Sequence, residues 1–335
     1  MTAAPPPAGR WRALWDRWRH AIAALSFLGG IASFALISRQ ERVAQALVIL
    51  LPLSWLLAAC EPALLRLADE RPRWRPPPWL LGYAAQALHQ ESLFFTLPFF
   101  FATTAWASPH LLFTATMTLL ALMTITDPLY YRHVLPRRAA VWGLHAVSGF
   151  VTALTAAPML WHLTTAQSLG LALACLGIVS VPAWHALLAR APLRLPLAVL
   201  LALALAGLGW QLRTMIPPAT LWVADMRMTA SVDPAARSAG PAIRDIAAED
   251  LRRHGLYAWT SIRVPRGLRE RVEHHWRLDG RTIDVVTLDV SGGREAGYRA
   301  WSRKTVFPAD PRGRWEVRVV THSGQLLGLA RFTVH

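Results

Sequence analysis

Three adjacent polar residues inside a long apolar segment are the first candidates for chemistry in this chain. His89, Gln90 and Glu91 follow Trp79 by ten to twelve residues. On a helix that begins near Trp79 they would lie about 15 Å along the axis, near the middle of a bilayer. Ionisable groups are costly there, and those that are present usually handle protons, ions or substrates. His89 and Glu91 are about 200° apart on a helix, so they cannot share one face.

A second set of ionisable residues lies at the ends of other apolar segments. Asp127, followed by Pro128, closes one segment, His145 opens the next, and His185 closes another. In a compact bundle these residues could line one cavity open to the cytoplasm. The alternative is structural: the end residues meet water or headgroups, and Glu91 bonds a neighbouring helix. The candidate intramembrane polar site comprises His89, Gln90, Glu91, Asp127, His145 and His185.

The sequence predicts neither a metal site nor a catalytic centre. Motifs of the HExxH, HxxxH and DxD types are absent, as is the glycine–serine pattern of a nucleophile elbow. Cys60 and Cys175 stand alone in apolar segments and form no zinc-type spacing. We therefore expect no cofactor. An enzyme is not the favoured interpretation, although the residues leave this open.

The segments that carry the polar residues are long enough to cross a membrane. A bilayer core about 30 Å thick needs about 20 apolar residues of helix. Seven segments qualify: 21–38, 43–60, 79–101, 111–126, 140–161, 169–189 and 195–212. The sequence therefore predicts a membrane α-helical bundle of about seven spans over residues 21–213, preceded by a basic N-terminus, residues 1–20.

The distribution of arginine orients these spans. The N-terminus and every second loop together carry thirteen arginines, whereas the loops between them carry two. The positive-inside rule then places the N-terminus in the cytoplasm and the region after the seventh span in the periplasm of a bacterial inner membrane. The same distribution explains the net charge of +15 without nucleic acid, which we do not expect as a partner.

After Pro217 and Pro218 the pattern changes to the period of two that is typical of strands. Seven strands are predicted: 221–229, 257–264, 271–278, 282–290, 298–307, 315–321 and 326–334. Asp279-Gly280 and Ser323-Gly324 are hairpin signals, and a short helix is predicted over residues 242–253. We predict a small all-β, immunoglobulin-like sandwich at residues 221–335, joined to the helices by a linker at residues 214–220.

An ordered series of residues in this β-region resembles a known family. The series runs through His275-Trp276, Gly292-Gly293, residues 298–304, residues 313–317, residues 324–327 and Phe332. It is similar to a bacterial domain-of-unknown-function family of C-terminal β-modules on polytopic inner-membrane proteins. The membrane half likewise looks like the uncharacterised helical region that accompanies the module. The resemblance implies this architecture and no activity.

Aromatic and basic residues of the β-region are candidates for a binding site. His275, Trp276, Arg299, Trp301 and Ser302 are suited to glycans, peptides or anionic ligands. The structural alternative is that the tryptophans fill the core while the arginines cover their faces. His274 and His275 project to opposite faces of a strand, which disfavours a chelating pair.

These observations favour an integral inner-membrane protein whose periplasmic β-sandwich binds a partner and whose helices anchor it. The expected partners are the lipid bilayer and an envelope protein or glycan. The alternatives are a transporter, or a membrane-embedded enzyme, that uses the intramembrane His, Glu and Asp residues.

Overall fold

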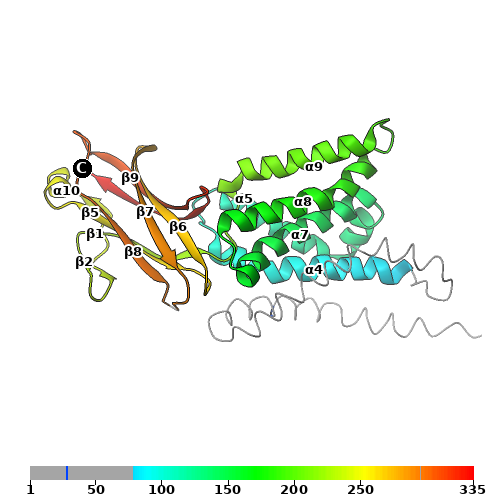
Figure 1. Cartoon of the computed structure of the whole chain (residues 1–335), viewed down its shortest axis with the longest axis horizontal. Helices are drawn as coiled ribbons and strands as arrows, with labels where there is room; N and C mark the ends of the chain where they lie inside the picture. The colour runs from blue at the N-terminus through cyan, green and yellow to red at the C-terminus, as the bar shows by residue number, and fades with distance from the viewer. Residues whose placement is uncertain (1–27, 29–77, 295) are drawn as a thin grey trace, which may run out of the picture.

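The computed structural model describes residues 28, 78–294 and 296–335. The described chain consists of a helical region and a β-rich C-terminal domain, which lie end to end (Figure 1). The predicted N-terminus and the predicted spans at 21–38 and 43–60 lie outside the described residues, Leu28 excepted.

The helices of the described region follow the predicted spans closely. Each of the last five predicted spans corresponds to one long helix, with ends that differ by a few residues. The helices are α4 (Pro78–Thr103), α5 (His110–Ile125), α6 (Asp127–Leu129), the π-helix η2 (Tyr130–Val134), α7 (Arg138–Trp161), α8 (Thr165–Leu187), α9 (Arg194–Gln211) and the 3₁₀-helix η3 (Arg213–Met215).

Three of these helices, α7, α8 and α9, are long and apolar enough to cross a membrane. A fourth span results if α5 and the bent segment 127–134 count as one. The predicted helical region is thus confirmed. Within the described residues, however, fewer helices are long and apolar enough to cross a membrane than the five that the sequence predicts there. The helix α4, which carries His89, Gln90 and Glu91, is not among them.

The segment after α5 turns sharply at Thr126. The helix axis bends by 91° between His110–Ile125 and Asp127–Val134, and Thr126 has an extended backbone with φ −91° and ψ 90°. Pro128 explains the break, because its ring and its missing N–H cannot continue the ladder of α5. A π-helix follows directly, and such π-turns are frequent at functional sites.

The last helix, α9, shows which surface of the bundle is apolar. Of its eighteen residues only Ala198 and Ala202 are buried. They face α8, where Gly177 allows close approach: a Cβ there would lie 3.5 Å from the Ala202 carbonyl oxygen. Small residues at such an interface let the backbones of two helices approach closely. The opposite side of α9 presents exposed leucines, among them Leu200 and Leu203.

The β-domain contains all seven predicted strands, in two main sheets. One sheet has the order β1-β5-β8 and the other the order β4-β10-β9-β6-β7. The long strands are β1 (Trp222–Thr229), β5 (Leu256–Arg263), β6 (Arg269–Leu278), β7 (Arg281–Ser291), β8 (Tyr298–Lys304), β9 (Gly313–Thr321) and β10 (Leu326–Val334). Three two-residue strands were not predicted: β2 (Val232–Asp233), β3 (Ser238–Ala239) and β4 (Asp245–Ile246).

The two sheets enclose an aromatic core. Trp276, Trp315 and Phe332 are buried together, with the Trp315 and Phe332 rings stacked 5.8 Å apart. The hairpin signal at Asp279-Gly280 is confirmed, since both residues have positive φ, +46° and +85°, as a type I′ turn requires. The predicted helix at 242–253 starts too early. The helix α10 spans Ala248–His254 because Asp245 and Ile246 instead pair in parallel with β10.

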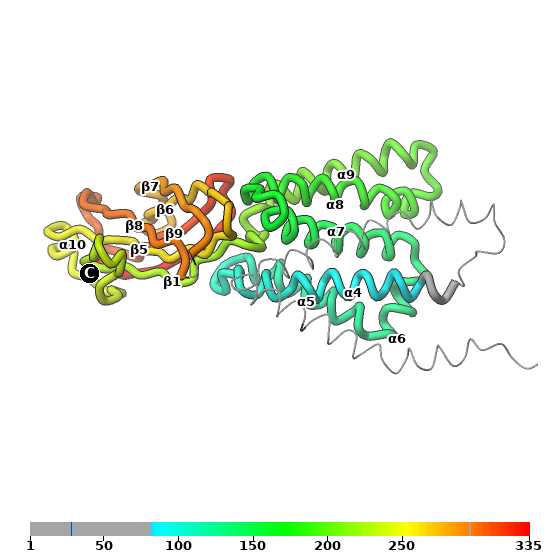
Figure 2. The backbone as a smooth tube through the Cα atoms, turned by 60° about the horizontal axis from the view of Figure 1, so that its bottom comes forward, coloured from blue at the N-terminus to red at the C-terminus, as the bar shows by residue number. Residues whose placement is uncertain are grey.

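The β-domain is seated directly on one end of the helices, as two views agree (Figures 1 and 2). The buried carboxylate of Glu270 on β6 accepts a 2.7 Å hydrogen bond from the backbone N–H of Thr165, at the start of α8. Arg213 Nε donates to the Ser323 carbonyl oxygen at 2.6 Å, and Gln325 Nε2 donates to the Ile216 carbonyl oxygen at 3.3 Å.

The segment that connects the two parts is buried rather than exposed. Residues 216–221 are all buried. Ile216 and Ala219 belong to the hydrophobic core of the helices, while Leu221 belongs to a core cluster of the β-domain. The connection therefore packs into both cores and fixes one part against the other.

Replacing Glu270 by alanine is expected to loosen this junction. The variant leaves the Thr165 N–H buried without its acceptor, which costs about 1–3 kcal/mol. Hydrogen–deuterium exchange should become faster at the first turn of α8. Glu273→Ala, the same change on the outer face of the same strand, serves as the control and should leave this turn unaffected. Equal exchange in the two variants would contradict the role given to Glu270.

Candidate functional site

A buried chain of three polar side chains links three elements of the helical region. His89 Nδ1 lies 3.1 Å from the Tyr130 hydroxyl, and His89 Nε2 lies 3.1 Å from His145 Nδ1. His89 and Tyr130 are 0% exposed and His145 is 6% exposed. The distances are those of hydrogen bonds, so both ring nitrogens of His89 are engaged. Two of the candidate residues, His89 and His145, are thus brought together.

Three separate elements supply this chain. His89 lies in the middle of α4, His145 lies in the second turn of α7, and Tyr130 opens η2. The break at Thr126 matters here, because it turns the segment 127–134 away from the axis of α5. Tyr130 thereby enters the hydrophobic core of the bundle, to which Leu93 and Leu97 of α4 also belong.

A second polar contact lies one turn earlier on α4. Gln86 Nε2 donates to Asp127 Oδ1 and to the Thr124 carbonyl oxygen, both at 2.9 Å. Gln86 and His89 are three residues apart, so they lie on one face of the helix. The amide of Gln86 joins Asp127 to this face and also satisfies a carbonyl at the end of α5. Gln86 was not among the predicted site residues, although its spacing from His89 is a usable signal.

The remaining candidates in the helical region lie apart from these contacts. Gln90 and Glu91 are half-buried and follow His89 on other faces of α4. His185 is half-buried near the end of α8. The structure therefore joins His89 to His145 directly and brings Asp127 to the same side of α4. The other three candidates, Gln90, Glu91 and His185, stay outside the hydrogen-bonded chain.

Hydroxyl groups continue the polar face toward the β-domain. The buried threonines Thr96 and Thr155 donate back to carbonyls of their own helices, the usual arrangement of hydroxyls in apolar helices. Ser92 on α4, and Ser148 and Thr152 on α7, differ. Their hydroxyl oxygens are buried and have no hydrogen-bond partner within residues 78–294 and 296–335. Buried groups of this kind are commonly satisfied by ordered water.

In the β-domain, two predicted binding residues lie inside the core. Trp276 is 0% exposed and Ser302 is 3% exposed. The Ser302 hydroxyl oxygen accepts a 3.2 Å hydrogen bond from Trp276 Nε1 and lies 2.9 Å from His274 Nδ1. His274 Nε2 lies 3.3 Å from the Thr260 hydroxyl. These contacts tie β6 to β5 and β8 across the two sheets.

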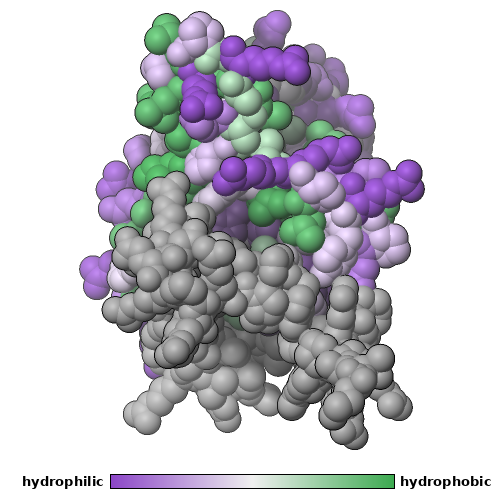
Figure 3. Space-filling view, turned by 90° about the vertical axis from the view of Figure 1, so that its right-hand side faces the viewer, coloured by the Kyte–Doolittle hydropathy of each residue, from purple (hydrophilic) through white to green (hydrophobic). Residues whose placement is uncertain are grey.

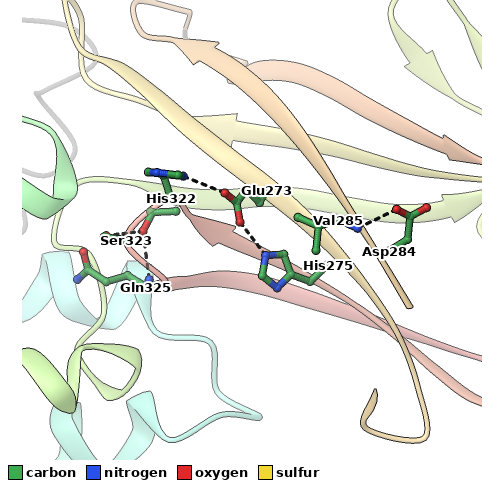
Figure 4. A network of polar contacts seen from close by, with 8 residues as sticks. Glu273, His275, Asp284, Val285, His322, Ser323 and Gln325 are labelled. Carbon is green, nitrogen blue, oxygen red and sulfur yellow. Dashed lines mark hydrogen bonds and ion pairs between the residues drawn. The ribbon is translucent and has the colours of Figure 1, made fainter. Parts of the chain in front are cut away.

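His275 lies on the outer face of the five-stranded sheet in a small ionic cluster (Figure 4). Glu273 accepts from His275 Nε2 at 2.8 Å and from His322 Nδ1 at 3.0 Å. Burial alone would raise the pKa of the Glu273 carboxyl, but the hydrogen bonds and charges of the two histidines hold this pKa below its ordinary value. Among the described residues, no group of three or more His, Cys, Asp or Glu could hold a metal ion.

Arg299 and Trp301 lie on the other outer face, that of the three-stranded sheet. Trp301 is paired with Trp259 of β5. The turn between β2 and β3 covers part of this face: Trp259 Nε1 donates to the Arg237 carbonyl oxygen at 3.1 Å, and Arg299 donates to the Ala236 carbonyl oxygen at 2.9 Å. The guanidinium of Arg237 lies 5.9 Å from the Trp301 ring centre. The five candidates of the β-domain thus occupy three different places.

The buried imidazole of His274 is expected to make the β-domain sensitive to acid. Burial lowers the pKa of His274 from 6.5 to about 4. The unfolded chain therefore takes up the proton first, and the free energy of unfolding falls by ~3 kcal/mol as the pH drops from 6.5 to 4. Hydrogen exchange of β6 amides should report this loss. His274→Gln should reduce the pH dependence in this interval, and a wild-type slope in that variant would disprove the assignment.

Two family models match the chain. Residues 1–258 match the family described as "Family of unknown function (DUF5924)", and residues 269–334 match the one described as "Protein of unknown function (DUF2914)". The first match ends within β5 and the second begins at the first residue of β6, so the division falls inside the β-domain. No curated protein and no solved structure matches the chain. Since the first model covers more than half of its length, the chain belongs to the family of unknown function DUF5924, with a DUF2914 region at its C-terminus.

Proposed function

We propose that this chain is a multi-pass protein of the bacterial inner membrane whose C-terminal β-domain is a binding module on the periplasmic side. The observation that carries this proposal is the seating of the β-domain on one end of the helices, with the arginine-rich loops at the other. The helices would then anchor the module at a fixed position above the membrane.

The charges at the two ends of the helices support this orientation. The described loops at the end away from the β-domain hold Arg132, Arg137, Arg138, Arg190 and Arg194. The loops 104–109 and 162–164 at the β-domain end hold no arginine or lysine. Seen from the far end, many residues in view are hydrophilic (Figure 3). Arginine-rich loops stay in the cytoplasm, which directs the β-domain to the periplasm.

The apolar outer surface of the helices supports insertion. Leu119, Leu200 and Leu203 are each more than 60% exposed, and such a surface is unfavourable in water. We propose seven spans in all, two of them in the apolar segments 21–38 and 43–60. The proposed boundaries are a cytoplasmic segment 1–20, a membrane domain 21–213, a linker 214–220 and a periplasmic domain 221–335.

The strand order supports an immunoglobulin-like sandwich. Counted along the chain, the first, second and fifth long strands (β1, β5 and β8) form one sheet. The third, sixth and seventh (β6, β9 and β10) lie together in the other, as in immunoglobulin domains. The fourth long strand, β7, pairs with β6, whereas in the constant-type domain the fourth strand belongs to the first sheet. Sandwiches of this class often serve as binding modules, an argument by analogy of fold.

Topology reporters test the orientation. Alkaline phosphatase fused after His335 should be active, because it folds only in the periplasm. The same enzyme inserted after Arg190, in the loop between α8 and α9, should be inactive. A cytoplasmic reporter should give the opposite pattern. Activity of the cytoplasmic reporter alone behind His335 would reject both the orientation and the periplasmic binding role.

The outer face of the three-stranded sheet is the proposed binding surface. Trp301 lies there beside the buried Trp259, and Arg299 and Arg303 flank Trp301 on the same strand. Aromatic rings beside guanidinium groups suit sugar rings, peptide side chains and anionic groups. We therefore propose an envelope protein or a glycan as the partner, with Arg299 and Trp301 as the principal contacts. On the opposite face, the acidic Glu273 and Glu316 are already paired with basic neighbours.

Photo-crosslinking in cells tests this surface. A photoreactive residue at position 303, exposed and next to Trp301, should yield a discrete crosslinked species. The same residue at position 285, exposed on the other sheet, should not. Trp301→Ala should remove most of the species at equal protein abundance. Identical patterns from positions 303 and 285, or an unchanged pattern in the Trp301→Ala variant, would exclude this face as the binding surface.

A further inference from the structure

We propose that the polar seam between α4 and α7 conducts protons through the helical region. The seam consists of Tyr130, His89, His145, Ser92, Ser148 and Thr152. This function goes beyond the binding role of the β-domain and does not depend on it. It requires only that the helices span a membrane.

The first part of the seam is a hydrogen-bonded chain that can move a proton in either direction. In one arrangement, His145 Nδ1–H donates to His89 Nε2 and His89 Nδ1–H donates to the Tyr130 oxygen, over the two distances of 3.1 Å. In the other, the Tyr130 hydroxyl donates to His89 Nδ1 and His89 Nε2–H donates to His145 Nδ1. Both arrangements satisfy the same atoms, because neutral imidazole has one donor and one acceptor.

Passage of one proton converts the first arrangement into the second. A proton is taken up by His145 Nε2, and the Nδ1 proton of His145 passes to His89 Nε2. The Nδ1 proton of His89 then passes to the Tyr130 oxygen, which releases its own hydroxyl proton on the other side. One proton enters and one leaves, and no bond between heavy atoms changes. Rotation of the two imidazole rings and of the Tyr130 hydroxyl then restores the first arrangement without carrying the proton back.

The second part of the seam leads from the histidines toward the β-domain. Both α4 and α7 run in this direction. Ser92 lies three residues after His89, while Ser148 and Thr152 lie three and seven residues after His145, so each hydroxyl shares the face of its histidine. All three residues are at most 3% exposed, and their hydroxyl oxygens have no hydrogen-bond partner among the residues that the structure describes. A buried hydroxyl with free bonding capacity is a binding position for water, which carries protons onward.

Polar groups also reach both ends of these helices. At the end with the arginine-rich loops, Asp127 is half-buried at the helix break and is bonded to Gln86, one turn before His89. At the β-domain end, the buried hydroxyls of Thr104 and Thr114 lie 2.6 Å apart. Polar groups thus extend from Gln86, in the third turn of α4, to Thr104, directly after the end of this helix.

A purely structural role explains only part of this arrangement. Structural hydroxyls in apolar helices bond to the preceding turn, as Thr96 and Thr155 do. An unpaired buried hydroxyl destabilises the fold by about 1–3 kcal/mol, so Ser92, Ser148 and Thr152 weaken the bundle unless a ligand satisfies them. Their alignment with two bonded histidines points to water and protons as that ligand.

Proton flux through the full-length protein in liposomes tests the proposal. Vesicles loaded with a pH-sensitive dye, a potassium gradient and valinomycin impose a membrane potential. Wild-type protein should raise proton uptake above that of protein-free vesicles. His89→Gln should lower this flux by about tenfold or more, since positioned proton donors contribute large rate factors. Uptake equal to that of protein-free vesicles would overturn the proposal.

Two threonines on one helix supply a matched control. Thr152→Val removes an unpaired hydroxyl and should abolish most of the flux, although it should not destabilise the protein. Thr155→Val removes a hydroxyl that is bonded within α7 and should leave the flux unchanged. Both variants are compared at equal amounts of folded, reconstituted protein. Equal flux in the two variants would overturn the water-filled part of the seam, and unchanged flux in His89→Gln would overturn the histidine relay.

Discussion

A polar group that is removed from water must find a partner inside the protein, because an unpaired one costs about 1–3 kcal/mol. This constraint shapes both parts of the chain. In the helical region it joins His89 to Tyr130 and His145. In the β-domain it joins His274 to Ser302. Between the two parts it joins the Glu270 carboxylate to the first turn of α8. Each of these bonds connects elements that are distant in sequence, so each also fixes how the elements pack.

The junction follows from the same constraint. Burial raises the pKa of the Glu270 carboxyl, and hydrogen bonds with Thr165 offset part of this effect. The backbone N–H of Thr165, at the start of α8, thus helps to stabilise the buried carboxyl. Together with the buried segment 216–221, this makes the β-domain a rigid continuation of the helices. A partner bound to the outer face of β8 would therefore act on a module that is held firmly and not on a flexible tether.

The buried hydroxyls that lack a hydrogen-bond partner in the described part of the chain are informative too. Six buried serine and threonine hydroxyls lie on α4 and α7 in the described part of the chain. Thr96, Thr103 and Thr155 bond to their own helices, whereas Ser92, Ser148 and Thr152 do not. Natural proteins break local rules mainly at functional or strained sites. Here the exceptions line up with His89 and His145, the bonded histidines of α4 and α7. The seam, and not the ionic cluster around Glu273, therefore carries the inferred activity.

The sequence by itself determined the elements. Long apolar runs and period-two alternation predicted five helices and seven strands of the described region, because both patterns are local properties of the chain. The Asp279-Gly280 turn was predictable for the same reason.

What only the tertiary structure decided is which polar residues meet. Tyr130 reaches His89 because Pro128 breaks the helix and the segment beyond it bends back into the bundle. Trp276 and Ser302 lie in the core, whereas Arg299 and Trp301 lie on a surface, because the pairing of sheets assigns the faces of each strand. Such contacts depend on how distant segments pack, and spacing along one helix or strand contains no information about its neighbour.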